Sequence, residues 1–131
     1  MTLKGKVKSG MNSLSFWMDE LEKYYTEKVG MRLYPGSLNI ELPELYILPS
    51  DVIRLEKEEY GGTVSLSILP CQIFGREAFI IRTDKNASGT GDHPLNIIEI
   101  ATDVKLRDEY NLVDGDIVEV TLYSREENIW K

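Results

Sequence analysis

The chain has 131 residues, 42% of them hydrophobic and 28% charged, a composition typical of a globular protein large enough for one domain with its own core. We therefore expect a single domain over residues 1–131. No apolar run approaches the roughly 20 residues that cross a bilayer, and residues 1–6 lack the apolar stretch of a signal peptide. We expect a cytoplasmic protein with no membrane partner.

The net charge of −7 argues against a nucleic-acid partner, because an acidic chain repels the phosphate backbone. Three lysines, Lys4, Lys6 and Lys8, alternate along a predicted strand, and a solvated strand face is the simpler interpretation of that pattern. A small phosphate ligand is not excluded, since it requires only a local cation or a nest of backbone amides.

A single cysteine, Cys71, excludes an internal disulfide. With one histidine, His93, it also cannot provide a usual zinc ligand set. Cys71 lies in the apolar stretch 68–73, so we expect a buried, unreactive side chain. His93 lies in a polar loop where no partner is fixed by the sequence, and we assign it no catalytic role.

The first third of the chain predicts a strand and then a helix. Residues 3–9 alternate as a strand does, and helical spacing follows from a cap at Ser13 or Ser15 to a C-terminal glycine at Gly30. The aromatic side chains of this helix are expected to contact the core. Residues 37–42 then alternate strictly as a strand, entered through a turn at 34–36.

The remainder of the chain predicts short strands joined by turns. We expect residues 56–60 and 63–69 to form a hairpin across Gly61 and Gly62, and a second pair to surround the turn at 74–76, with 78–82 as its second strand. Residues 96–101 and 117–123 predict further strands, separated by a helical turn near 104–108 and a β-turn over 112–116. The polar loop 84–94 is long for so small a domain, as functional or disordered loops usually are. Many short strands and one main helix predict a mainly β fold, either a small barrel or a sandwich.

Two groups of side chains suggest chemistry. Ser37 and Asn39 share one strand face, and their neutral oxygens suit Mg²⁺ when phosphates supply the remaining ligands, although solvated side chains after a turn are the simpler alternative. Glu99 stands among isoleucines, so its carboxylate is either exposed on one strand face or satisfied by a partner in a pocket. Lys105 and Arg107 could reach a phosphate or a base edge, whereas residues 114–116 form mainly a turn.

Taken in order, these segments resemble the archaeal CTP-dependent riboflavin kinases from about Leu3 to Leu122. The motifs that carry the resemblance are Gly5-Lys6-Val7-Lys8-Ser9-Gly10, Tyr34-Pro35-Gly36-Ser37-Leu38-Asn39, Leu69-Pro70, Ile97-Ile98-Glu99-Ile100, Lys105-Leu106-Arg107-Asp108 and Leu112-Val113-Asp114-Gly115-Asp116. The resemblance implies a small six-stranded cradle-loop β-barrel. It also implies transfer of a phosphoryl group from CTP to riboflavin, giving FMN and CDP.

The resemblance also assigns site residues. The family's Gly-Thr-Leu-Asn metal motif falls on 36–39, which implies Mg²⁺ on Ser37 and Asn39. Its flavin-contacting residues fall on Thr90 and Glu99. Nucleotide binding falls on a group of residues from two segments: Gly10, Met11, Val104, Lys105, Leu106 and Arg107.

One departure from the family pattern leaves alternatives open. The family has a glycine-rich loop of the kind Gly-Leu-Gly-Glu-Gly, but here only Gly10 is retained, so side chains stand where backbone amides would meet phosphate. The leading interpretation is a monomeric riboflavin kinase acting on small molecules, and the alternative is a relative that binds flavin or nucleotide without catalysis. The acidic charge, and the absence of a helix-turn-helix segment, argue against a DNA-contacting barrel.

Overall fold

The computed structural model describes residues 1–9, 21–84 and 95–123. Within them the chain forms seven strands and three short helices: β1 (Thr2–Lys8), α2 (Glu22–Val29), β2 (Leu38–Glu41), β3 (Ile53–Leu55), α3 (Lys57–Tyr60), β4 (Leu66–Ile73), β5 (Arg76–Thr83), β6 (Ile97–Ala101), α5 (Leu106–Glu109) and β7 (Ile117–Leu122). Among the described residues, no helix is long and apolar enough to cross a membrane.

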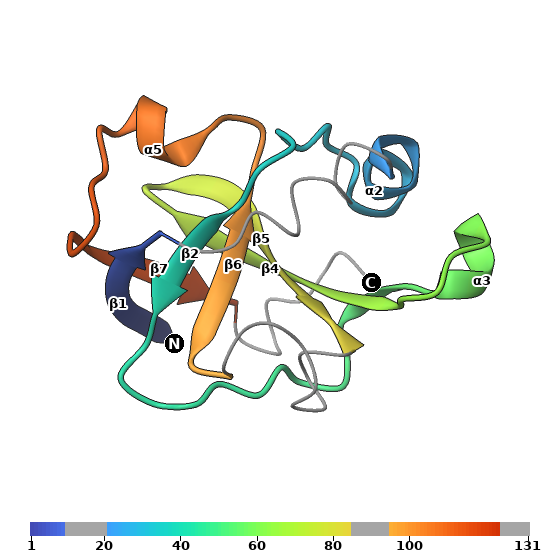
Figure 1. The fold of residues 1–131 in the computed structure, drawn as a ribbon, viewed down its shortest axis with the longest axis horizontal. Coiled ribbons are helices and arrows are strands. Elements are labelled where there is room, and N and C mark those ends of the chain that lie inside the picture. Colours follow the sequence, from blue (N-terminus) through green and yellow to red (C-terminus); the bar gives the residue numbers. More distant parts are fainter. Residues whose placement is uncertain (10–20, 85–94, 124–131) are drawn as a thin grey trace.

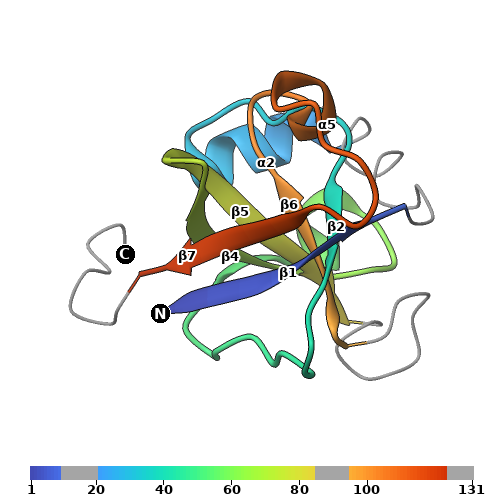
Figure 2. The same ribbon diagram turned by 90° about the vertical axis from the view of Figure 1, so that its left-hand side faces the viewer.

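Six antiparallel strands close into a barrel. The strand order is β3-β4-β5-β6-β2-β1-β7, and a further pairing between β4 and β7 closes the ring, while β3 lies outside it as an extra partner of β4. The predicted mainly β fold and six-stranded barrel are thus confirmed. Figure 1 shows the barrel with α2 and α5 at its upper end, and Figure 2 shows β1 and β7 side by side.

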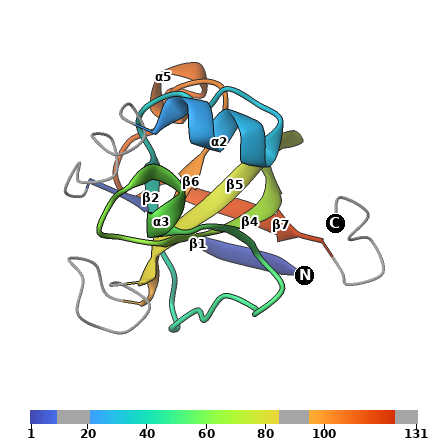
Figure 3. The same ribbon diagram turned by 90° about the vertical axis from the view of Figure 1, so that its right-hand side faces the viewer.

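Alternating side chains divide the apolar residues into two cores. One cluster combines inward-facing side chains of all six barrel strands: Val7, Leu38, Ile40, Leu69, Cys71, Ile73, Ala78, Ile80, Ile98, Ile100, Val118, Val120 and Leu122 belong to it. A second cluster joins α2 to the outer face of the sheet and includes Leu21, Tyr25, Leu55, Leu66, Ile68, Phe79, Ile81 and Ala101. Figure 3 shows α2 lying across these strands, with α3 below it.

Two glycines explain local features of the fold. Gly30 ends α2 in the left-handed region at φ 72°, which confirms the predicted C-terminal cap, while Ser13 and Ser15 lie outside the described residues. Gly5 lets β1 approach β2 closely, because a Cβ at this position would lie 2.5 Å from the carbonyl oxygen of Glu41. The lysines of β1 are exposed, as expected for a solvated strand face.

The hairpin predicted for residues 56–60 and 63–69 is wrong in its first half. Lys57–Tyr60 is the helix α3, and the strand that pairs with β4 is Ile53–Leu55. The side chain of Glu59 accepts a hydrogen bond from the Glu56 amide at 2.8 Å, and Gly61 ends the turn at φ 70°. This capping of a charged segment favours a helical turn over a strand.

The hairpin between β4 and β5 forms where the sequence predicted it. Its turn places Phe74 at φ 54° and Gly75 at φ 72°, and the Phe74 ring stacks on Tyr110 with 4.1 Å between ring centroids. Pro70 fits inside β4 because residues 66–68 pair with β3 and residues 71–73 with β7. On that side, none of the strand residues that the structure describes pairs with the proline. Cys71 is fully buried, as predicted.

Candidate functional site

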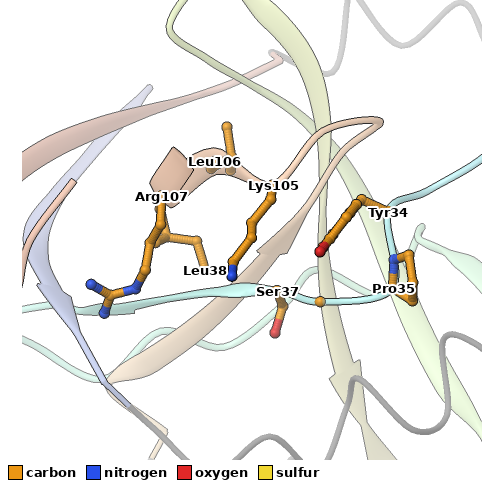
Figure 4. Close-up of a pocket in the computed structure, with 8 residues that line it drawn as sticks. Tyr34, Pro35, Ser37, Leu38, Lys105, Leu106 and Arg107 are labelled. Carbon is orange, nitrogen blue, oxygen red and sulfur yellow. The ribbon is translucent and has the colours of Figure 1, made fainter. Parts of the chain in front are cut away.

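A pocket of about 340 Å³ opens between the segment that enters β2 and the start of α5. Figure 4 shows its lining side chains, which come from two stretches of the chain: Tyr34, Pro35, Gly36, Ser37 and Leu38 on one wall and Lys105, Leu106 and Arg107 on the other. This volume is in the range of small-ligand sites, roughly 300–1,000 Å³.

Strand pairing brings these two walls together. β2 and β6 are antiparallel with Leu38 opposite Ile100, so the segment before β2 lies beside the segment after β6. The amide of Tyr34 donates a hydrogen bond to the carbonyl of Thr102 at 2.7 Å, and the amide of Gly36 donates to the carbonyl of Tyr34 at 2.8 Å. The wall containing Ser37 is therefore tied to the chain that leads into α5.

Ser37, Asn39 and Glu99 form one polar cluster beside this pocket. The Ser37 hydroxyl donates to Glu99 Oε1 at 3.1 Å, and Asn39 lies directly opposite Glu99 in the pairing of β2 with β6. Glu99 is 5% exposed, so the alternative of a carboxylate exposed on one strand face is wrong. Asn39 is 7% exposed, so it is not a solvated side chain after a turn either.

The Asn39 side chain shows what this cluster can hold. Its Oδ1 atom is buried and has no hydrogen-bond partner among the described residues. An unsatisfied buried oxygen costs free energy unless something supplies a positive or donating group. Together with the Ser37 hydroxyl, this oxygen fits a hard cation, because Mg²⁺ prefers oxygen ligands and keeps sites open for water and phosphate.

The cluster lies on the outer face of the barrel, next to α2. Glu99 is opposite Ile81, which belongs to the apolar cluster under this helix. Tyr25 of α2 is 1% exposed, and within the part of the chain that the structure describes its hydroxyl has no hydrogen-bond partner. Burial, and then the nearby Tyr60 and Glu99, raise the pKa of Tyr25, so its hydroxyl remains a neutral donor.

Two cations lie on the opposite wall of the pocket. Figure 4 shows the Lys105 side chain extending toward Ser37, and the Lys105 ammonium lies 3.9 Å from a carboxylate oxygen of Asp108. The Arg107 guanidinium donates to Asp114 Oδ1 at 2.6 Å. This contact, and then hydrogen bonds from Ser9, hold the pKa of Asp114 below its usual range. The wall can therefore present positive charge to an anionic ligand.

Arg82 is a buried cation that the sequence did not single out. It is 5% exposed and donates hydrogen bonds to the carbonyls of Tyr46, Leu95 and Ile97. Burial lowers the pKa of Arg82, and the neighbouring Glu99 acts in the opposite direction. An arginine late in a strand, just before a long polar loop, was the only signal available.

The predicted site residues thus fall into three groups. Ser37, Lys105, Leu106 and Arg107 line one pocket, and Asn39 and Glu99 adjoin it through Ser37. Val104 instead packs against the barrel core, and its role in nucleotide binding stays a prediction. Gly10, Met11 and Thr90 lie outside the described residues, as does His93.

Comparison with known proteins identifies the family. A family model described as "CTP-dep_RFKase: Domain of unknown function DUF120" matches residues 7–122. The chain therefore belongs to the CTP-dependent riboflavin kinase family.

Individual relatives are named riboflavin kinase. The chain is 36% identical to the riboflavin kinase of Methanocella arvoryzae, covering 92% of this chain and 56% of the relative, and 36% identical to that of Pyrobaculum aerophilum, covering 92% and 60%. It is 27% identical to the riboflavin kinase of Staphylothermus marinus over 95% of this chain and 94% of the relative. The chain thus spans little more than half the length of the first two relatives but nearly all of the third.

Proposed function

We propose that this chain is a CTP-dependent riboflavin kinase that converts riboflavin and CTP to FMN and CDP. The observation that carries the proposal is the meeting of Ser37, Asn39 and Glu99 beside a pocket lined by Lys105 and Arg107. These residues come from separate parts of the chain, yet each belongs to a motif of the family. The relatives named riboflavin kinase support the same reaction.

The side chains divide the work of positioning and charge neutralisation, which dominate phosphoryl transfer. Ser37 and Asn39 would hold Mg²⁺, whose charge offsets that of the nucleotide phosphates. Glu99 accepts the Ser37 hydrogen, which leaves the hydroxyl oxygen free to act as a ligand. Glu99 and Thr90 would orient the flavin, while Lys105 and Arg107, with Gly10 and Met11, would bind the nucleotide.

In the reaction itself, the ribityl 5′-hydroxyl oxygen of riboflavin forms a bond to the γ-phosphorus of CTP. The bond from that phosphorus to the β-phosphate oxygen breaks, CDP leaves with the electron pair, and the hydroxyl proton is released. Lys105 stabilises the negative charge on the transferred group because its ammonium extends into the pocket.

The test is to incubate the purified protein with riboflavin, Mg²⁺ and each nucleoside triphosphate separately, and to measure FMN by chromatography. We expect FMN with CTP, and a loss of at least about 100-fold in Ser37→Ala, the order expected when a positioning contact is removed. Ser67→Ala is the matched control, because Ser67 on β4 accepts a hydrogen bond from Arg54 of β3 and does not line the pocket. No FMN with any of the four triphosphates would end the proposal.

The second candidate is a relative that binds flavin without turnover. It is favoured by the segment Gly10-Met11-Asn12-Ser13, which lacks the other glycines of the family loop. Quenching of riboflavin fluorescence without FMN formation would identify this function.

We further propose that residues 1–131 act as one riboflavin-kinase-like barrel domain, monomeric and cytoplasmic. Light scattering on the eluting peak should give the 15.0 kDa of one chain. A peak of twice that mass would contradict the monomer.

A further inference from the structure

Asp114, in the turn between α5 and β7, contacts two separate parts of the pocket region. Its Oδ1 atom accepts hydrogen bonds from Arg107 at 2.6 Å and from the Ser9 hydroxyl at 3.0 Å. Its Oδ2 atom accepts from the Ser9 amide at 3.2 Å. One carboxylate thereby joins the residue that follows β1 to a cation of the pocket wall.

The turn that contains Asp114 does not need this carboxylate for its own shape. The Gly115 amide donates to the carbonyl of Val7 at 2.8 Å, and the Val7 amide donates to the carbonyl of Asp116 at 2.8 Å. The side chain of Asp116 accepts from the Val113 amide at 2.9 Å, and Gly115 adopts the left-handed φ of 95°. Backbone contacts and Asp116 therefore build the turn, and the Asp114 side chain points to other partners.

The consequence concerns Arg107. A free arginine samples many rotamers, and ordering it on a ligand costs conformational entropy. The 2.6 Å contact to Asp114 fixes the guanidinium before a ligand arrives, and charge-assisted hydrogen bonds of this kind are the stronger ones. The guanidinium has further N–H groups that Asp114 does not use, and these can face an anion in the pocket.

We propose that Asp114 is a positioning residue for the phosphate-donor half of the site, where it holds Arg107 in place to bind the nucleotide phosphates. This proposal rests on the proposed function, because it takes the nucleotide as the ligand of the wall formed by residues 105–107. Asp114 itself touches no substrate; it acts through Arg107.

The matched control is the Arg76–Asp103 pair. Its guanidinium–carboxylate distance is 2.7 Å, and its side chains are 29% and 51% exposed, against 30% and 54% for Arg107 and Asp114. Neither Arg76 nor Asp103 lines the pocket. Asp103→Asn therefore removes an equivalent surface ion pair without touching the proposed ligand.

The experiment compares Asp114→Asn, Asp114→Glu and Asp103→Asn in steady-state kinetics and in direct binding of CDP by calorimetry. We expect Asp114→Asn to raise the KM for CTP and the Kd for CDP on the order of tenfold, with kcat and the KM for riboflavin changed less than about twofold, as loss of a single charged contact predicts. Asp114→Glu should recover part of the affinity, and Asp103→Asn should match wild type. Equal nucleotide affinity in Asp114→Asn and Asp103→Asn overturns the proposal.

A double variant separates positioning from general damage. In an Arg107→Met background, Asp114→Asn should change the Kd for CDP by less than about twofold, since the group on which it acts is gone. A full tenfold effect in that background overturns the proposal. If wild type binds CDP but forms no FMN, the kinase proposal fails, while the Kd values for CDP still test the role of Asp114. If wild type binds no CDP, both proposals fail.

Discussion

At the scale of single residues, Asn39 and Glu99 form a polar site that is buried among apolar side chains. They face each other across β2 and β6, and their exposed fractions are only 7% and 5%. Burial of this kind strengthens every local charge interaction, because the surrounding dielectric is low. The site is therefore sensitive to any added charge.

Asn39→Asp tests this sensitivity. The change places a second carboxylate directly opposite Glu99, and like charges facing each other across two strands are destabilising. We expect a lower midpoint of thermal unfolding in EDTA, and a larger rise on adding Mg²⁺ than wild type shows, because a cation between the carboxylates offsets their repulsion. Asn111→Asp is the control, since it adds the same charge at an exposed position. Equal midpoints of thermal unfolding for Asn39→Asp and Asn111→Asp, both in EDTA and in Mg²⁺, would contradict a cation site at Asn39.

Cys71 gives a second prediction at this scale. Burial raises the pKa of its thiol to about 12, so the reactive thiolate is scarce at neutral pH. We expect iodoacetamide at pH 8 to leave the native protein unmodified and to alkylate Cys71 fully in guanidinium chloride, as mass spectrometry would show. Alkylation of the native protein at the rate of the unfolded chain would mean that the barrel interior opens readily.

The sequence predicted some of these residues and missed others for a physical reason. Strand alternation placed Ser37 and Asn39 on one face, and the apolar neighbours of Glu99 drew attention to it, but the resemblance to the family supplied their roles. Tyr25 and Arg82 were missed because nothing local distinguishes a tyrosine near a buried carboxylate from one in a core, or a buried arginine from an exposed one. Their importance depends on partners far away in the chain.

At the scale of elements, strand alternation and glycine positions predicted most of the fold. The end of α2 at Gly30, the turn before Arg76 and the last strand all formed where the pattern indicated. The strand predicted for residues 56–60 was wrong because the two adjacent glycines suggested a hairpin. The hydrogen bond from the Glu56 amide to the Glu59 side chain instead stabilises a helical turn. The strand pattern alone left a barrel and a sandwich open, because the pairing of β4 with β7 that closes the ring joins residues about 50 positions apart; the family resemblance implied the barrel.

The closeness of β1 and β2 can be tested by Gly5→Ala. The new Cβ would lie 2.5 Å from the carbonyl oxygen of Glu41 and 2.7 Å from Cγ2 of Ile40, so one of the strands has to shift. Overpacking of this kind costs about 1–3 kcal/mol of the free energy of unfolding. Lys6→Ala, on the exposed face of the same strand, should change it by no more than about 0.5 kcal/mol. Urea denaturation of both variants measures the difference, and equal midpoints would show that the strands are not tightly apposed.

At the scale of the whole molecule, the closed barrel determines where the site forms. Because each strand is held on both sides, the starts and ends of β2 and β6 have fixed neighbours, and the pocket walls follow from that register. Outside the ring, side-chain hydrogen bonds from Arg54 help to hold β3 in place. Arg54 donates hydrogen bonds to Glu56, Ser67 and Asp84, which ties β3 to β4 and to the residue that follows β5.

This network should set part of the pH dependence of stability. Hydrogen bonds from Arg54 lower the pKa of Asp84 from 3.8 and that of Glu56 from 4.5, and a hydrogen bond from Lys28 lowers that of Glu59. A carboxylate whose pKa is lower in the folded state stabilises the protein above its unfolded pKa and loses that contribution as the pH falls through its folded pKa. We therefore expect these groups to contribute fully to the free energy of unfolding from about pH 6 to 8 and progressively less below about pH 4.

Arg54→Met removes the cation from two of these carboxylates, so urea denaturation between pH 3 and 7 should show a shallower loss of stability on acidification than in wild type. Arg32→Met is the matched control, because it removes the same charge from a side chain that is 80% exposed and pairs only with Glu22 among the described residues. The control should keep the wild-type slope, since it leaves the contacts of Arg54 with Glu56 and Asp84 in place. If the free energy of unfolding falls with pH along the same curve in Arg54→Met and Arg32→Met, Arg54 is a surface cation without a role in anchoring β3.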